Sequence, residues 1–148
     1  MKAKKIYLVV AIVIIATGIF WLLASNSKPS DSNPIKIGAS EALTGKFASL
    51  GEPRAKAMKM AADEINNNGG INGKRLEIIT EDNQGDAKVA VTNASKLLNI
   101  DNVDVVVTGF THITNAIKSL VAEKNKVMIY ASTVRDIAEG NKLFFRDY

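Results

Sequence analysis

The sequence contains no cysteine and only one histidine, His112. Without cysteine there is no disulfide, no cysteine-based metal site, no thiol nucleophile and no lipid attached through cysteine. No serine stands in a G-x-S-x-G motif, and the single histidine cannot be paired with an identifiable nucleophile, so we place His112 in a loop. We therefore predict no catalytic residues and no enzymatic activity.

Motifs that bind nucleotides or metal ions are also missing. Residues 38–43 (GASEAL) lack the G-x-G-x-x-G of a dinucleotide-binding turn, and residues 44–47 (TGKF) lack the Ser or Thr that ends a P-loop. Glu81, Asp82 and Asp86 do not have the spacing of a calcium loop, and we interpret Asp86 as a helix N-cap. No cofactor and no metal site is predicted, and a Rossmann-type enzyme stays only as an alternative.

The positive charge of the chain is concentrated near its start. The net charge is +4, from 19 basic and 15 acidic residues, and four of the lysines lie within the first 31 residues. The remainder is close to neutral and has no basic patch with interleaved aromatic residues. This distribution excludes nucleic acid as the expected partner.

Residues 6–24 form an unbroken apolar run that follows Lys2, Lys4 and Lys5. A helix of this length spans roughly 28 Å, about one bilayer core. The lysines are expected to stay in the cytoplasm. We predict a signal anchor over residues 1–24, in a single-pass protein of the cell membrane whose domain is extracytoplasmic. A signal peptide that is cleaved, giving a secreted or periplasmic protein, is the alternative.

Residues 25–34 (SNSKPSDSNP) contain no apolar side chain, so we predict a flexible polar linker there and a domain from residue 35 to residue 148. Within that domain, short apolar segments alternate with helical patterns. The predicted strands are residues 35–39, 76–80, 103–108, 127–131 and 143–145.

The three predicted helices each have an apolar face. The first opens near Pro53, ends near Asn66 and buries Ala57, Met58, Ala61, Ala62 and Ile65. The second starts at Ala87 and buries Ala90, Ala94, Leu97 and Leu98. The third is capped by Thr111 or Thr114 and buries Ala116, Ile117, Leu120 and Val121.

This alternation predicts the α/β class, with an open parallel sheet and helices on both faces. The continuous valines at 105–107 indicate a strand that is covered on both faces. In such sheets a ligand lies beyond the carboxyl ends of the strands. Those ends are the loops that follow Ala39, Thr80, Thr108 and Ala131.

Residues 35–86 resemble the type 1 periplasmic binding proteins of branched-chain amino acid (leucine, isoleucine, valine) ABC transporters. The resemblance is carried by Leu-Thr-Gly at 43–45, Gly51, Glu-Ile-Asn at 64–66, Gly-Gly-Ile-Asn-Gly at 69–73 and Leu76. It continues through residues 122–127 and 145–146. The resemblance implies a solute-binding protein that closes two lobes on a small ligand, of which this sequence holds the first lobe.

The resemblance also implies a set of ligand-binding residues. Thr111 stands where the family binds the ligand carboxylate with a hydroxyl, and Ser132 where a backbone carbonyl accepts from the ligand ammonium. The next family threonine is replaced by Val134, so Thr133 becomes a candidate. Leu50 stands where the family often has an aromatic wall.

The partners implied are a small solute, with an amino acid expected, the membrane through the N-terminal helix, and an ABC permease. A ligand-sensing receptor ectodomain with the same fold is the alternative within binding proteins. The sequence is less than half the length of typical family members, so we expect an incomplete binding protein.

Overall fold

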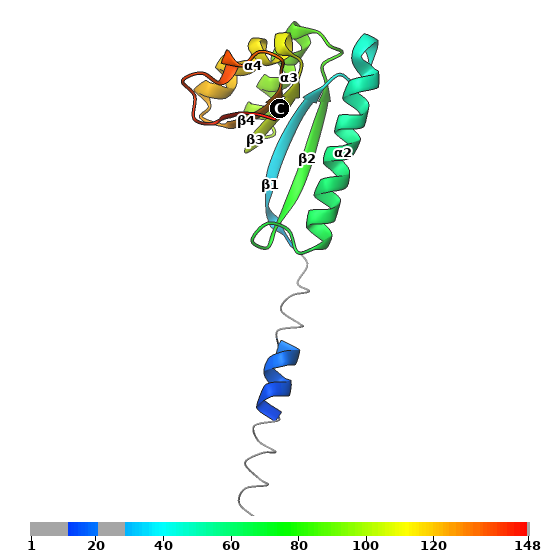
Figure 1. The fold of residues 1–148 in the computed structure, drawn as a ribbon, viewed down its shortest axis with the longest axis vertical. Helices are drawn as coiled ribbons and strands as arrows, with labels where there is room; N and C mark the ends of the chain where they lie inside the picture. Colours follow the sequence, from blue (N-terminus) through cyan, green and yellow to red (C-terminus); the bar gives the residue numbers. More distant parts are fainter. Residues whose placement is uncertain (1–11, 21–28, 148) are drawn as a thin grey trace, which may run out of the picture.

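The computed structural model describes residues 12–20 and 29–147. Residues 29–147 form a five-stranded parallel sheet in the order β2-β1-β3-β4-β5, with β1 and β2 much longer than the other strands (Figure 1). The strands are β1 (Ser30–Glu41), β2 (Lys74–Asp82), β3 (Val105–Gly109), β4 (Val127–Ala131) and β5 (Phe144–Arg146). The helices are α2 (Ala48–Asn67), α3 (Ala87–Asn99) and α4 (Thr111–Glu123), with 3-10 turns η1 (Gly45–Phe47) and η2 (Asp136–Ala138).

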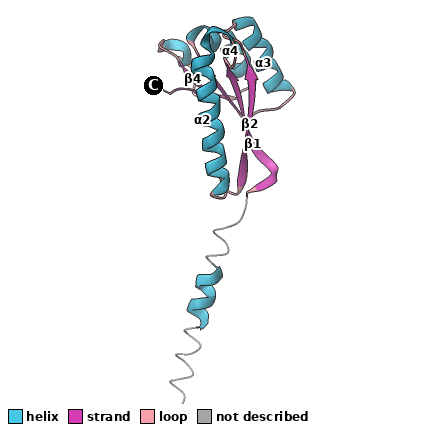
Figure 2. Ribbon diagram, turned by 90° about the vertical axis from the view of Figure 1, so that its right-hand side faces the viewer, coloured by secondary structure: helices cyan, strands magenta, loops and turns pink. Residues whose placement is uncertain are grey.

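Helices lie on both sides of this sheet, as the sequence predicts (Figure 2). The connection from β1 to β2 runs in one direction along the sheet, and those from β2 to β3 and from β3 to β4 run in the other. Because parallel crossovers are right-handed, α2 lies on one face and α3 and α4 lie on the opposite face. The reversal of direction at β1 and β3 creates a topological switch point at the carboxyl ends of these strands.

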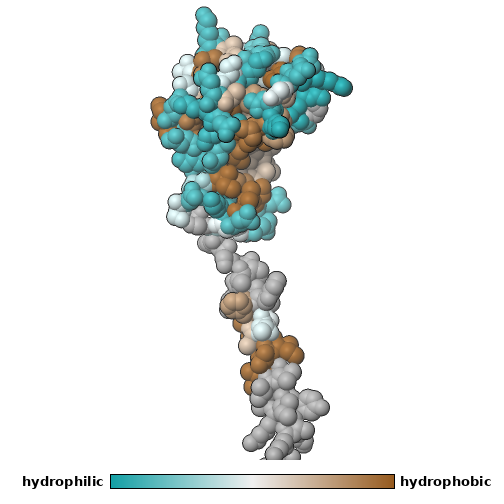
Figure 3. All heavy atoms as spheres, turned by 90° about the vertical axis from the view of Figure 1, so that its left-hand side faces the viewer, coloured by the Kyte–Doolittle hydropathy of each residue, from teal (hydrophilic) through white to brown (hydrophobic). Residues whose placement is uncertain are grey.

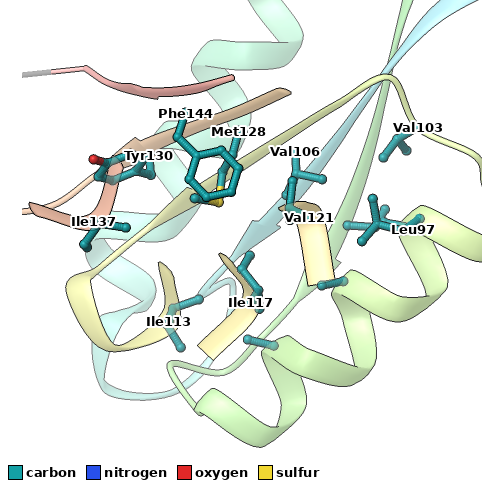
Figure 4. Close-up of a cluster of buried hydrophobic side chains, with 13 residues drawn as sticks. Leu97, Val103, Val106, Ile113, Ile117, Val121, Met128, Tyr130, Ile137 and Phe144 are labelled. Carbon is teal, nitrogen blue, oxygen red and sulfur yellow. The ribbon is translucent and has the colours of Figure 1, made fainter. Parts of the chain in front are cut away.

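The main core lies between the sheet and the pair α3 and α4 (Figure 4). Leu97, Ile117 and Val121 reach from the helices toward Val106 and Met128 of the sheet, and all five are completely buried. Gly38 permits this approach because a Cβ there would lie 3.1 Å from the Leu97 side chain. The predicted buried positions of α3 are confirmed: Ala90, Ala94, Leu97 and Leu98.

The other face of the sheet is covered only in part. Val107, Ile129 and Phe145 occupy neighbouring strands in register and point to the same side. Ile129 is 37% exposed and Phe145 is 53% exposed. The prediction that β3 is covered on both faces holds only in part, because α2 packs mainly on β1 and β2 and Val107 of β3 is half-buried. Hydrophobic residues also gather at the surface in the view of Figure 3.

Helix α2 differs from its prediction in both its start and its buried face. It begins at Ala48, directly after η1, so Pro53 lies inside the helix and not at its first turn. Of the five predicted core positions only Ala62 is buried, while Met58 is half-buried and the other three are exposed. The apolar periodicity of this helix therefore overstated its buried face, because α2 contacts the sheet mainly through β1 and β2.

Strand β1 is longer than the sequence predicts. It begins at Ser30, which pairs with Lys74 of β2, and a register shift separates this pair from the regular ladder that starts at Ile35. Residues 30–34 of the expected polar linker are therefore strand. Backbone hydrogen bonding to β2 holds this polar segment in place without any apolar side chain.

Most of the predicted signal anchor, residues 1–24, lies outside the described residues. Its middle part, residues 12–20, is helical, and every side chain there is exposed, including Ile15 and Phe20. Within residues 12–20 and 29–147, no helix combines the length and the apolar character needed to cross a bilayer.

Candidate functional site

A cavity of about 520 Å³ opens at the carboxyl edge of β3 and β4, beside the switch point of the sheet. All four residues proposed from the sequence line it: Leu50, Thr111, Ser132 and Thr133. They come from the first turn of α2, the first turn of α4 and the loop after β4. The fold therefore brings together residues that are separated by up to 83 positions in the chain.

Three hydroxyl groups gather at one part of this cavity. The Thr111 Oγ1 lies 2.8 Å from the Ser132 Oγ and 3.5 Å from the Thr133 Oγ1. The Ser132 Oγ also accepts a hydrogen bond of 3.1 Å from the backbone N–H of Val134. Since that N–H already donates to Ser132, the serine hydroxyl has its proton available for Thr111 or for a ligand.

The N-terminus of α4 also lies at this cavity. Its N-cap is Phe110, with φ of 67°, and no side chain caps the helix. The prediction that Thr111 or Thr114 caps it is therefore wrong: Thr111 is the first helical residue, and the Thr114 hydroxyl donates back to the Phe110 carbonyl. An uncapped helix N-terminus beside free hydroxyls is a favourable place for an anion.

The sequence analysis missed two aromatic residues of the cavity. Phe47 of η1 and Phe110 both line it, with their ring centroids 4.7 Å apart. They form an apolar wall where Leu50 alone was expected. Both follow the ends of strands, but they belong to no periodic pattern, and they meet because β1 and β3 are neighbours in the sheet.

His112 also lines the cavity, and its assignment to a loop is wrong. It lies in the first turn of α4, is exposed, and places its Nε2 atom 3.1 Å from the carbonyl oxygen of Gly85. With a carbonyl as neighbour, that nitrogen carries the proton and donates. The ring therefore links α4 to the loop before α3.

Arg54 was also missed, and it is the only charged side chain that lines this cavity among the described residues. Its Nη2 donates to the Thr108 carbonyl at 3.3 Å and lies 3.3 Å from the Glu41 Oε1. Gly109 leaves the space for the guanidinium, because a Cβ there would meet the Nη1 atom at 2.5 Å. No sequence motif marks this pair, which joins the end of β1 to α2.

The Glu41 side chain is completely buried, whereas that of Arg54 is 31% exposed. Neither carboxylate oxygen of Glu41 has a hydrogen bond within the described part of the chain. Burial raises the pKa of Glu41 to about 7, with the Asp147 charge adding to the effect and the Arg54 charge opposing it. A carboxylate in this position is close to half-protonated at neutral pH.

Asp82, at the end of β2, fixes the loop that leads into the cavity wall. Its carboxylate accepts from the Leu43 and Thr44 backbone amides, the Thr44 hydroxyl and the Gln84 amide, at 2.6–3.3 Å. Burial acts to raise the pKa of Asp82, but these hydrogen bonds outweigh it and the pKa is lowered. The Leu-Thr-Gly motif is thus a structural anchor for η1.

The predicted N-cap at Asp86 is confirmed, because its carboxylate accepts from the Lys88 and Val89 amides at 2.8 and 3.0 Å. Within the described ranges, no group of three His, Cys, Asp or Glu residues could hold a metal ion. Asp82 holds the loop and Asp86 caps α3, whereas Glu81 pairs with Lys96 at 2.6 Å.

Open parallel α/β sheets bind small ligands at the switch point, and the hydroxyl-lined cavity lies beside it. A family model described as periplasmic binding protein matches residues 34–146. The chain is 35% identical over 126 residues to the leucine-, isoleucine-, valine-, threonine- and alanine-binding protein of Pseudomonas aeruginosa, an alignment that covers 83% of this chain and 33% of the relative.

Solved structures give the same result. The branched-chain amino acid transporter substrate-binding protein of Streptococcus pneumoniae, in complex with isoleucine, superposes with a TM-score of 0.73 at 28% identity, covering 77% of this chain and 33% of that one. A type 1 periplasmic binding protein of Bordetella pertussis gives a TM-score of 0.70 at 26% identity, covering 77% and 33%. This chain belongs to the periplasmic binding protein family, in its type 1, branched-chain amino acid binding group. It spans about one third of the length of these relatives.

Proposed function

We propose that this chain forms the first wall of an extracytoplasmic binding site for an amino acid or a similar small carboxylate, in the solute-binding component of an ABC transporter. The observation that carries the proposal is the cavity at the carboxyl edge, which is lined by Leu50, Thr111, Ser132 and Thr133 together. The isoleucine complex of a structural relative and the amino acid-binding relative in Pseudomonas aeruginosa support it.

In the proposed binding mode the ligand carboxylate accepts from the Thr111 hydroxyl and from the free amides of the first turn of α4. The charge of the carboxylate interacts favourably with the positive end of the helix. The Ser132 carbonyl accepts from an ammonium group, and Thr133 supplies a further hydroxyl. Phe47, Phe110 and Leu50 contact the apolar part of the ligand.

A single wall predicts weak binding. A site that encloses its ligand between two walls at roughly micromolar affinity gains about 8 kcal/mol, and half of that interaction corresponds to about millimolar affinity. The second wall would come from polypeptide that corresponds to the remaining two thirds of the relatives. Closure, which excludes water and strengthens the polar contacts, would need both walls.

The test is an NMR titration of the 148-residue chain in detergent micelles with leucine, isoleucine, valine and a wider amino acid panel. We expect saturable shifts at Thr111, Ser132 and Thr133 with about millimolar affinity. Thr111→Ala should weaken binding about fivefold, the loss of one charge-assisted hydrogen bond. Thr92→Ala, which removes an exposed hydroxyl on α3, is the matched control and should bind as the parent does.

Two results would contradict the proposal. Shifts that do not map to the cavity, or that persist unchanged in Thr111→Ala, would show that the hydroxyl cluster is not the ligand site. Micromolar or tighter binding by this chain alone would refute the single-wall account of the affinity.

The N-terminal segment supports a further part of the proposal, attachment to the membrane with the domain on the extracytoplasmic side. Residues 12–20 are helical and expose large apolar side chains, 58% for Ile12 and 72% for Phe20. Exposed apolar surface of this kind is stabilised by a lipid or protein environment. The three lysines at positions 2, 4 and 5 orient the segment with its start in the cytoplasm.

A further inference from the structure

Arg54 has an unusual setting for a residue of an ion pair. Its partner, Glu41, is completely buried behind it at the end of β1, so a ligand in the cavity meets the guanidinium and not the carboxylate. Among the described residues, no Asp or Glu lines the cavity. The lining is therefore one cation, hydroxyl groups and an aromatic wall.

The guanidinium is held in place without using all of its donors. Nη2 is occupied by the Thr108 carbonyl and by the approach of Glu41, each at 3.3 Å. Within residues 29–147, Nε and Nη1 have no hydrogen-bond acceptor, and the Glu41 oxygens have no hydrogen bond of their own. Because Gly109 has no side chain, the planar group lies against the sheet edge with one part facing the cavity.

We infer that Arg54 is a ligand-binding residue of this cavity and that it selects solutes with a second carboxylate, such as a dicarboxylate or an acidic amino acid. The inference rests on the proposed function, in which Thr111 and the start of α4 bind the first carboxylate. A guanidinium N–H without a protein acceptor forms a charge-assisted N–H···O bond to a carboxylate, which is stronger than its bond to the oxygen of a neutral amide. Glu41 is a positioning residue that acts only through Arg54.

If Arg54 were only a counter-charge for Glu41, the expected results would differ. In that case the ligand would not sense the guanidinium, and removal of Arg54 would affect stability alone. The two accounts are separated by a pair of ligands with the same shape and different charge. L-glutamate and L-glutamine form such a pair.

The experiment is an NMR titration of the 148-residue chain in detergent micelles with L-glutamate, L-glutamine and L-leucine. We expect glutamate to bind about fivefold more tightly than glutamine, the effect of one charge contact that is screened by water. The Arg54 Nε–H resonance should shift with glutamate and stay in place with glutamine. Arg54→Met should reduce the preference to about one.

Arg54→Met leaves the buried Glu41 carboxylate without its partner and is expected to lower stability, so a second pair of variants is needed in a background without the buried acid. Glu41→Gln should retain the preference for glutamate, because the guanidinium is still held by the Thr108 carbonyl. The double variant Glu41→Gln/Arg54→Met should lose it. Dispersed amide spectra of both proteins would show that the comparison is made between folded states.

Equal binding of glutamate and glutamine, or a preference that survives in the double variant, would overturn the inference about Arg54. Leucine binding that depends on Thr111 would in that case leave the proposed function intact. If none of the three ligands binds at millimolar concentration, the proposed function itself fails, and the inference fails with it.

Discussion

The buried carboxylate of Glu41 lies 3.3 Å from the Nη2 atom of Arg54, so the end of β1 is tied to α2 by an ion pair that is open to solvent on one side only. The pair sits at the switch point of the sheet, where the connections that leave β1 and β3 run in opposite directions along the sheet. Parallel strands end together there, and polar groups that follow them are concentrated at one edge.

This relationship predicts that stability depends on pH. Burial raises the pKa of Glu41 from 4.5 to about 7, so the folded state binds the proton more tightly than the unfolded state. The contribution of protonated Glu41 to the free energy of unfolding is complete below about pH 4.5. As pH rises through 7 this contribution, up to about 3 kcal/mol, is lost. The charges that face Glu41 are Arg54 of α2 and Asp147 after β5.

Chemical denaturation of the parent and of Glu41→Gln between about pH 5 and pH 8 measures this effect. The free energy of unfolding of the parent should fall across this range, and that of Glu41→Gln should fall much less. The same slope in both proteins would mean that another group is responsible.

Substitution of Asp82 is expected to lower the free energy of unfolding through the loss of local hydrogen bonds. Asp82→Ala removes the acceptor for three backbone amides and for the Thr44 hydroxyl, so we expect a cost of about 1–3 kcal/mol. Because the pKa of Asp82 is lowered, its contribution is present at neutral pH and is lost as pH falls below about 4.

Urea denaturation at neutral pH measures this cost. Glu77→Ala, which removes an exposed carboxylate from the same strand, is the matched control and should change stability by less than about 0.5 kcal/mol. An Asp82→Ala protein as stable as this control would show that the loop is held by other contacts.

The half-covered sheet predicts that two adjacent residues respond differently to the same substitution. Met128 is completely buried beneath α3 and α4, whereas Ile129 points to the other face and is 37% exposed. Met128→Ala should cost about 2–5 kcal/mol, and Ile129→Ala about 1 kcal/mol. The measurement is the free energy of unfolding of both variants in the same buffer. Equal losses would indicate that the face of Ile129 is covered in solution.

The proposed membrane topology predicts protection of the N-terminus alone. Protease added outside intact cells or spheroplasts should degrade the domain, residues 29–147, while an epitope placed before Lys2 stays intact. The control is the same digestion after lysis, which should remove the epitope. A domain that resists external protease while lysed samples are cleaved would refute this orientation.

The sequence by itself determined the order and type of the elements between β1 and β5. Apolar side chains recur with helical periodicity in α3 and α4 and form short runs in β2 and β4. These patterns predict the element type because they depend only on neighbouring residues in the chain. The N-cap at Asp86 is equally local, since it needs only the next three residues. The family signature located Thr111, Ser132, Thr133 and Leu50, and all four line one cavity.

Tertiary structure alone decided what covers each face and which polar groups meet. The apolar residues of α2 could not reveal that this helix packs mainly on β1 and β2, because that depends on the direction of the crossovers. Thr111 could serve as an N-cap by its type, but the positive φ of Phe110 starts the helix at that threonine and aims its hydroxyl at Ser132.

The pairing of Glu41 with Arg54 was decided in the same way. The two residues are 13 positions apart, on a strand and on a helix, and no local rule joins them. Only the packing of α2 over the carboxyl end of β1, with Gly109 leaving room, brings the guanidinium to the buried carboxylate and to the cavity. Electrostatic interactions depend on distance and burial, and the fold determines both.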